Sequence, residues 1–138
     1  MAYIKYKEVT KYFYFSKEIH RDNLPNYVIE YTNTNEKILM GYKTAKDYGV
    51  FTDQKIILFD KGSTFGIYKQ IFTIPYNTIS TISIIYKPNG AELSLFLNSG
   101  YPLRLKFINM KNPNPGEPNI YKENLKKIYL YISSRITK

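Results

Sequence analysis

The sequence predicts a mainly β (α+β) domain: seven antiparallel strands forming a barrel or two orthogonal sheets, capped by a C-terminal amphipathic helix, with a short N-terminal helix. From Ile38 to Tyr86, alternating apolar and polar runs follow one another, separated by turn residues. This pattern is typical of an antiparallel meander. After Asn119 the apolar residues instead recur at helical spacing. A chain of 138 residues is long enough for one such domain with its own core.

The N-terminal part is predicted to be an aromatic and basic extension, residues 1–22, followed by a compact domain over residues 23–138. The extension contains an unbroken aromatic run from Tyr12 to Phe15. One interpretation is a short strand that covers a sheet edge. The alternative is a partner-binding patch, since exposed aromatic side chains mark interfaces. We favour the strand, because aromatic side chains are more often buried for stability.

A short helix is predicted next. Asp22 and Asn23 supply a capping side chain before Pro25, which suits the first turn of a helix. Residues at helical spacing follow: Leu24, Tyr27, Val28 and Tyr31. The polar run 33–35 ends the pattern, so we expect about two turns that depend on tertiary packing to persist.

The seven strands are expected at about residues 37–43, 48–52, 55–60, 68–75, 79–86, 91–97 and 102–108. Asn-Gly and Ser-Gly turns separate the last three of them. In the final strand, apolar residues alternate with Arg104 and Lys106, which places these two cations on the outer face. Glu92 is expected on the outer face too, where it can pair with a cation.

A loop and a helix complete the predicted chain. Residues 112–118 contain three prolines and a glycine, which exclude a helix or a central strand. Asn119 is then expected to cap the final helix. Its apolar stripe consists of Tyr121, Leu125, Ile128, Tyr129, Ile132 and Ile136. We expect this stripe to lie on the open end of the strands.

Several segments resemble one family in order and spacing: residues 42–47 and 50–60, the Ile-Pro-Tyr motif in 74–79, and Ala-Glu-Leu in 91–93. Together they resemble the bacterial pleckstrin-homology-like (PH) domain family, over about residues 30–135. The resemblance implies a PH-like architecture and a non-catalytic role. Some members of this family form ring-shaped homo-oligomers, so the resemblance also implies self-association, and the functions of most members are unassigned.

The residue types exclude most catalytic and metal chemistry. The chain has no cysteine, which rules out a disulfide, a thiol nucleophile and a cysteine-based metal centre. His20 is the one histidine, and it has no positioned partner in the pattern. The Gly62–Gly66 turn lacks the Gly-Lys-Ser/Thr ending of a phosphate loop. We therefore predict no enzyme activity, no catalytic residue, no metal site and no cofactor. Three spaced acids are expected to cap hairpins: Asp47, Asp53 and Asp60.

The net charge of +9 is concentrated near the C-terminus, where residues 104–138 hold eight lysines and arginines against two glutamates. Such a balance attracts nucleic acid, anionic lipid or an acidic protein face. It also fits a lysine-rich composition with solvated side chains. The candidate ligand-binding residues are Lys43, Lys46, Lys55, Lys61 and Lys69. The candidate protein-interface residues are Tyr12, Tyr14, Lys122 and Lys126.

The function predicted from these features is a non-enzymatic binding or scaffold module for another protein, self-association included. The alternative is weak binding of an anionic lipid or other anionic ligand through basic surface loops. Nucleic acid is also a less favoured partner than another protein. No apolar run is long enough to span a membrane, and the segment Met1–Lys7 has no apolar signal core. We therefore expect a cytoplasmic protein.

Overall fold

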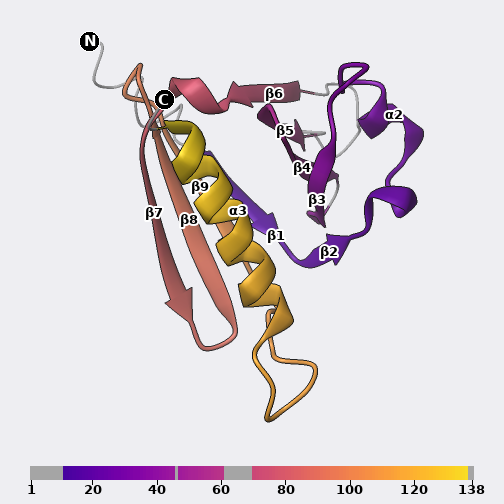
Figure 1. Cartoon of the computed structure of the whole chain (residues 1–138), viewed down its shortest axis with the longest axis vertical. Helices are drawn as coiled ribbons and strands as arrows, with labels where there is room; N and C mark the ends of the chain where they lie inside the picture. Colours follow the sequence, from indigo (N-terminus) through magenta and orange to yellow (C-terminus); the bar gives the residue numbers. More distant parts are fainter. Residues whose placement is uncertain (1–10, 46, 61–69, 137–138) are drawn as a thin grey trace.

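The structure is a computed structural model that describes residues 11–45, 47–60 and 70–136, and it contains two β-sheets with a long helix beside them (Figure 1). The elements are β1 (Lys11–Phe15), β2 (Lys17–Ile19), the 3₁₀ turn η1 (Arg21–Asn23), α2 (Asn26–Ile29), β3 (Ile38–Lys43), β4 (Tyr48–Thr52), β5 (Lys55–Asp60), β6 (Gln70–Pro75), the 3₁₀ turn η2 (Tyr76–Thr78), β7 (Ile79–Lys87), β8 (Gly90–Leu97), β9 (Pro102–Phe107) and α3 (Ile120–Ile136).

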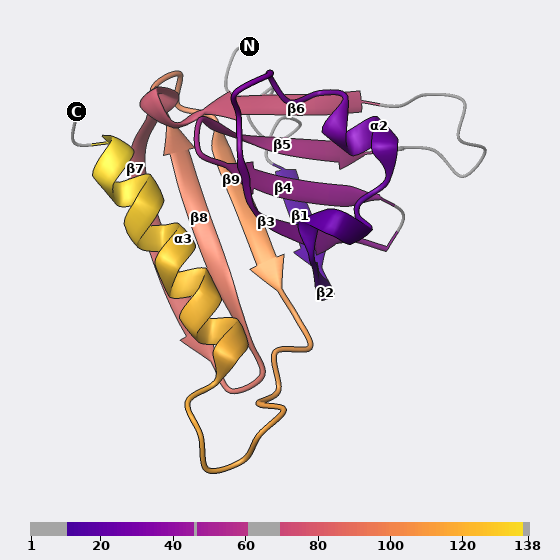
Figure 2. The same cartoon turned by 45° about the vertical axis from the view of Figure 1, so that its right-hand side comes forward.

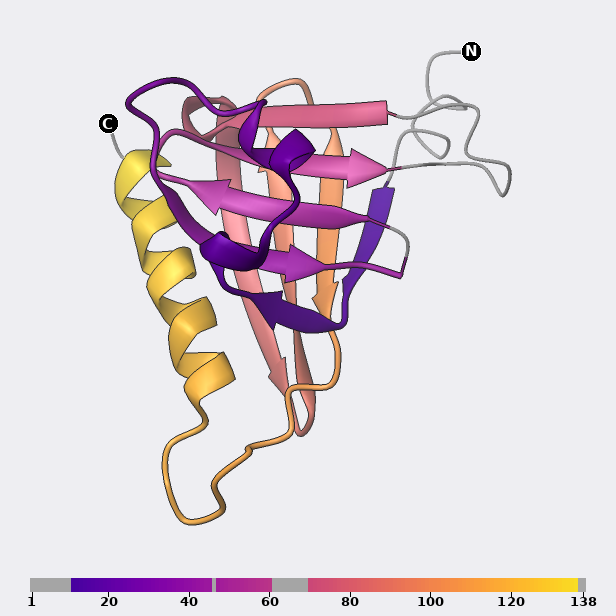
Figure 3. The same ribbon diagram turned by 90° about the vertical axis from the view of Figure 1, so that its right-hand side faces the viewer.

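The strands form a four-stranded sheet, in the order β1-β9-β8-β7, and a five-stranded sheet, in the order β2-β3-β4-β5-β6. Strands of one sheet run across those of the other (Figure 3). All seven predicted strands are confirmed, and so is the prediction of two crossed sheets. The alternative of a barrel is wrong, because the two sheets are not closed against each other. The chain passes from β6 to β7 through η2, which follows Pro75 and forms the corner between the sheets (Figure 2). β6 and β7 belong to different sheets and do not pair with each other.

The aromatic run of the N-terminal extension is an edge strand, as predicted. β1 pairs in parallel with β9, with Phe13 opposite Leu105. Phe13 and Phe15 point into the core, whereas Tyr14 between them is 50% exposed. β2 joins the other sheet beside β3. The described part of the extension is therefore built into both sheets, and the division of the chain at residue 22 stays a prediction.

Two hydrophobic cores cover the two faces of the five-stranded sheet. The larger core lies between the sheets and α3, and the smaller one lies on the outer face under α2. β5 contributes to both: Ile56 and Leu58 belong to the larger core, and Ile57 and Phe59 to the smaller one. All four of these side chains are at most 1% exposed. A strand buried on both faces reads as a continuous apolar run, which is what β5 shows.

The N-terminal helix is shorter than predicted and begins later. Asp22 and Asn23 lie in η1, and they do not cap a helix of two turns; α2 has only four residues. Pro25 restricts the residue before it, and Leu24 is extended, with φ −77° and ψ 144°. The helix therefore starts only after Pro25. Leu24 and Val28 are nonetheless buried against the sheet, as the spacing implied.

The C-terminal helix matches its prediction. The Asn119 side-chain oxygen accepts hydrogen bonds from the backbone N–H groups of Tyr121 and Lys122, at 3.0 and 3.4 Å. Leu125 and Ile132 are fully buried, and Ile128 is nearly so. No helix in the described residues is long and apolar enough to cross a membrane.

The ring of Phe15 in β1 packs closely on the backbone of Gly49 in β4. A Cβ atom at Gly49 would lie 2.6 Å from Cε1 and 2.7 Å from Cζ of the Phe15 ring. Gly49→Ala should therefore lower the free energy of unfolding by about 2 kcal/mol, the usual cost of overpacking a core. Urea unfolding followed by circular dichroism measures this loss.

The clash can be assigned to Phe15 by a double-mutant cycle. Gly49→Ala should cost clearly less in a Phe15→Leu background, because the smaller side chain leaves room for the methyl group. Equal costs in both backgrounds would show that Phe15 does not press on this position.

Candidate functional site

The turn between β4 and β5 is held by a buried ion pair. Lys55 Nζ lies 2.5 Å from a carboxylate oxygen of Glu36, whose side chain is 0% exposed. The Thr52 hydroxyl donates to the same carboxylate, and the backbone N–H of Asn33 donates to it at 2.8 Å. Burial acts to raise the pKa of Glu36, but the hydrogen bonds from Lys55, Thr52 and Asn33 outweigh it and hold this pKa below its ordinary value. Lys55 is therefore paired with a carboxylate whose role is structural.

Two tyrosine hydroxyls bind the carbonyl groups of the same turn. Tyr76 of η2 donates to the Thr52 carbonyl at 2.6 Å, and Tyr131 of α3 donates to the Asp53 carbonyl at 2.6 Å. The two rings are in contact, with their centroids 5.8 Å apart. The turn therefore joins the five-stranded sheet to the corner between the sheets and to the terminal helix.

The other predicted ligand-binding lysines do not join Lys55. Lys43 Nζ lies 4.6 Å from the centre of the Tyr48 ring. Since Tyr48 begins β4 and Thr52 ends it, Lys43 and Lys55 flank opposite ends of a five-residue strand, roughly 15 Å apart at the usual rise per residue. The remaining three, Lys46, Lys61 and Lys69, lie outside the described residues.

The acidic side chains at the hairpin ends act as caps. Asp47 is buried, and it accepts hydrogen bonds from the Tyr27 hydroxyl at 2.6 Å and from the Tyr48 N–H at 3.0 Å. Asp53 accepts from the backbone N–H of Lys37 at 3.1 Å. His20 is exposed, and its Nδ1 accepts from the backbone N–H at position 22. In the described part of the chain, no three potential ligands are grouped as a metal ion would require.

The predicted interface residues come from two separate elements, β1 and α3. Tyr14 lies on the outer face of the four-stranded sheet, where Lys106 Nζ is 5.5 Å from the centre of its ring. Tyr12 is on the same strand, opposite Arg104. Lys122 and Lys126 belong to α3, which packs on the core side.

The outer face of the four-stranded sheet carries paired charges. Glu92 lies 3.7 Å from Arg104 and 3.9 Å from Lys87, so the predicted pairing of Glu92 with a cation is confirmed. Arg104 also donates to the Ser94 hydroxyl at 3.0 Å. These contacts neutralise part of the positive charge near the C-terminus.

The edge of β7 is a feature that the sequence analysis missed. β7 is nine residues long and lies at the edge of its sheet. It exposes 53% of Ile85 and 46% of Tyr86, and Lys87 at its end is its one charged residue. The other edge strands of the described sheets are shorter, with three residues in β2, five in β1 and six in β6. The alternation of apolar and polar residues predicted a strand here, but it could not show that this strand lies at the edge of its sheet.

α3 flanks this edge on the core side. Lys122 Nζ donates to the carbonyl groups of Lys87 at 2.7 Å and Pro88 at 3.4 Å, which fixes the first turn of the helix beside the end of β7. Partial burial and the nearby Glu123 carboxylate raise the pKa of Tyr86. Lys126 lies one helical turn after Lys122 and is exposed, so it faces the same side. Two of the predicted interface residues thus border the free edge.

Comparison with known proteins identifies relatives of this fold. The family model described as bacterial PH domain matches residues 8–112. A crystal structure of a protein with a pleckstrin-homology domain from Shewanella loihica superposes with a TM-score of 0.63 and 22% identity, over 86% of this chain and 95% of that one. A pleckstrin homology domain from Shewanella amazonensis gives a TM-score of 0.54 and 24% identity, over 78% and 83%. No curated protein sequence matches the chain significantly.

Glu36→Gln should lower the free energy of unfolding by about 3 kcal/mol near neutral pH, because it leaves Lys55 without its buried partner. The pKa of Glu36 is lowered in the folded state, so its contribution is present above the unfolded pKa. It is lost as the pH falls below about 4.3 and through the lowered pKa. The difference between wild type and variant should therefore shrink in acid, as measured by urea unfolding at several pH values.

Glu30→Gln is the matched control, because Glu30 is exposed and loses the same charge. It should change the stability by less than about 0.5 kcal/mol. A wild-type advantage over Glu36→Gln that stayed constant from neutral to acidic pH would contradict the role of the Glu36 carboxylate.

Proposed function

Because this chain belongs to the bacterial PH domain family, we propose that it is a non-enzymatic binding module that holds a segment of another protein at the free edge of β7. The family fixes the fold and not the partner, so the proposal rests on the surface of this chain. The observation that carries it is a nine-residue edge strand with exposed apolar side chains and one terminal charge.

An extended segment can bind such an edge as an additional strand. Its backbone would pair with the outward N–H and C=O groups of β7, and alternate side chains would supply specificity. Proteins usually protect long edges with charges, prolines or bulges. β7 has one register irregularity, near Ile79, and its sequence from Thr81 to Tyr86 contains no charge and no proline.

The charge of this surface favours an acidic segment. Lys122 and Lys126 on α3 border the edge, and the whole chain carries a net charge of +9. A second copy of the protein would bring the same positive charge to the interface, whereas an acidic segment would be attracted. Binding to a partner of opposite charge is therefore favoured over self-association.

The alternative, weak binding of an anionic lipid through basic loops, has less support. Lys55 is neutralised by Glu36, and Lys43 lies at the other end of β4. Each basic residue near an anionic membrane contributes only about 1 kcal/mol. Isolated lysines of this kind support weak adsorption at most.

The first test replaces an exposed apolar residue of the edge by a charge. Peptides selected from a random displayed library should bind the wild-type protein, and Ile85→Lys should weaken them at least about ten-fold, because a charge at the edge opposes strand addition. Leu130→Lys is the matched control, since Leu130 is similarly exposed, at 54% against 53%, but lies on α3. Equal affinity of both variants, measured by fluorescence anisotropy, would remove β7 as the binding edge.

The second test addresses the preference for acidic partners. Lys126→Glu should weaken binding of the selected peptides, whereas Lys127→Glu, the same change on the neighbouring exposed residue, should have a clearly smaller effect. The loss should diminish at high salt, because exposed charges are screened. If the two variants bound alike, Lys126 would have no special place beside the edge.

Light scattering at dilute concentration separates self-association from binding of another protein. A monomer that binds acidic peptides supports the proposal. A dimer or larger assembly that Ile85→Lys dissociates would instead identify a second copy as the occupant of the edge.

A further inference from the structure

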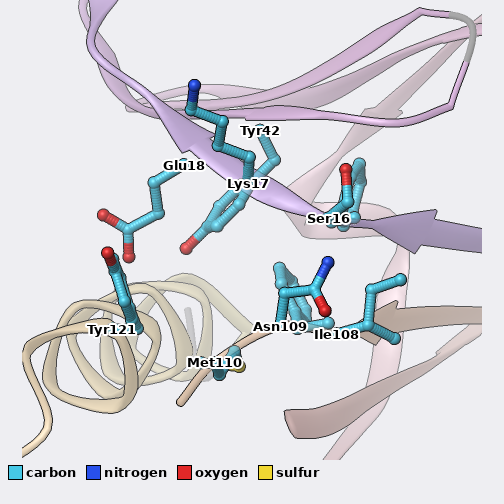
Figure 4. A pocket seen from close by; sticks show the side chains of 10 residues that line it. Ser16, Lys17, Glu18, Tyr42, Ile108, Asn109, Met110 and Tyr121 are labelled. Atoms are coloured by element: carbon cyan, nitrogen blue, oxygen red, sulfur yellow. The ribbon is translucent and has the colours of Figure 1, made fainter. Parts of the chain in front are cut away.

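A small cavity lies between β2, β3, the segment after β9 and the first turn of α3 (Figure 4). Its volume is about 130 Å³. The side chains that give it chemical character are Phe15, Glu18, Tyr42, Asn109, Met110 and Tyr121. They come from four separate segments, so no local motif announces the cavity in the sequence.

Tyr42 presents an unpaired hydroxyl to this cavity. The residue is only 3% exposed, and its hydroxyl has no hydrogen-bond partner among the described residues. The hydroxyl points into the cavity, toward the side where Glu18 and Tyr121 lie (Figure 4). The ring cannot turn away easily, because it packs against Phe15 and Phe107 at centroid distances of 5.4 and 4.9 Å. A buried polar group without a partner is costly, which points to an occupant.

Glu18 supplies a carboxylate that has no cation beside it in the described part of the chain. Asn124 of α3 donates to both of its oxygens, at 3.1 and 3.4 Å. Burial raises the pKa of Glu18, and the hydrogen bond from Asn124 only partly offsets this. Lys17, the strand neighbour of Glu18, also lines the cavity, but the residue is exposed and its amine points away from the Glu18 carboxylate (Figure 4). Alternation along β2 therefore turns the acid inward and the base outward.

We propose that this cavity binds a primary ammonium group at the end of a short alkyl chain. The ammonium donates hydrogen bonds to the Glu18 carboxylate and to the Tyr42 hydroxyl oxygen. The alkyl chain packs against the Tyr121 ring and Met110. A volume of 130 Å³ equals that of roughly four waters at about 30 Å³ each, which suits a chain of about five non-hydrogen atoms. The lysine side chain of a peptide and a small free amine share this chemistry.

Other ligand classes fit the cavity less well. An anion would meet the Glu18 carboxylate at close range. A neutral group could bond with Tyr42, but it would leave the half-buried charge of Glu18 without a counter-ion. The positive end of α3 is near, yet Asn119 accepts from two of its free N–H groups, which reduces the attraction for anions. Aromatic walls and one carboxylate form the environment that an alkylammonium prefers.

This site is independent of the proposed strand addition at β7. Asn124 lies on the flank of α3 that faces β2, whereas Lys122 bonds to the end of β7 on the other flank. Ile85→Lys should leave the cavity unchanged. Failure of either proposal can therefore be distinguished from failure of the other.

The test uses n-butylammonium, n-butanol and a short peptide with one central lysine, whose other residues are uncharged and whose ends are acetylated and amidated. Each is titrated into the whole protein and followed by amide NMR. Butylammonium should shift the amide signals of Ser16, Glu18 and Asn109. Glu18→Gln and Tyr42→Phe should each weaken this binding about ten-fold, the usual effect of losing a hydrogen bond to a charged group. The matched controls Glu123→Gln and Tyr31→Phe, at exposed residues, should leave it unchanged.

The lysine peptide distinguishes the sources of the ammonium group. Tighter binding of the peptide than of butylammonium identifies a protein side chain as the ligand, and tighter binding of the free amine identifies a small molecule. Equal affinity for n-butanol, or wild-type affinity in Glu18→Gln, overturns the proposal, as does the absence of any shift. Tyr42→Phe removes only the unpaired hydroxyl and should keep the wild-type melting temperature, so loss of binding in this variant cannot be ascribed to unfolding.

Discussion

The β4–β5 turn is the point on which the arrangement of the larger elements depends. The buried carboxylate of Glu36, from the segment before β3, accepts hydrogen bonds from the Thr52 hydroxyl and the Lys55 amine. Tyr76 of η2 and Tyr131 of α3 donate to the carbonyl groups of the turn. A buried carbonyl that loses its donor costs far more than an exposed one, so each of these bonds restricts where its element can lie. The turn thus sets the corner between the sheets and the position of α3 together.

The position of α3 in turn creates both candidate binding surfaces. The helix is anchored to the five-stranded sheet through Tyr131 and Asn124, and to the end of β7 through Lys122. One flank therefore closes the cavity that Glu18 and Tyr42 line, and the other borders a free strand edge. One helix therefore contributes to both sites, and the segment after β9 adds Asn109 and Met110 to the lining of the cavity.

The structure shows where the residues named from the sequence lie, and their roles stay predictions. Tyr14, Lys122 and Lys126 were named from exposed aromatic and basic patterns, and the described structure places all three at the surface or beside the free edge. Lys55 looked equally basic but pairs with Glu36, nineteen positions away in the chain. Glu18 and Tyr42 carried no signal at all, because their cavity is completed by Met110 and Tyr121 from distant segments.

Local periodicity determined the seven strands, the Asn119 cap and the apolar stripe of α3, since each depends on residues within a few positions of one another. The same periodicity predicted a longer helix than α2, because Pro25 keeps Leu24 in an extended conformation although Leu24 falls at helical spacing. Only the tertiary structure decided which strands pair, for example that β1 joins β9 in parallel, and that the sheets stay open. It also decided that, among the described residues, no strand pairs with the outer edge of β7. Alternation tells a strand which face to bury, whereas its neighbours are chosen by contacts between residues far apart in the chain.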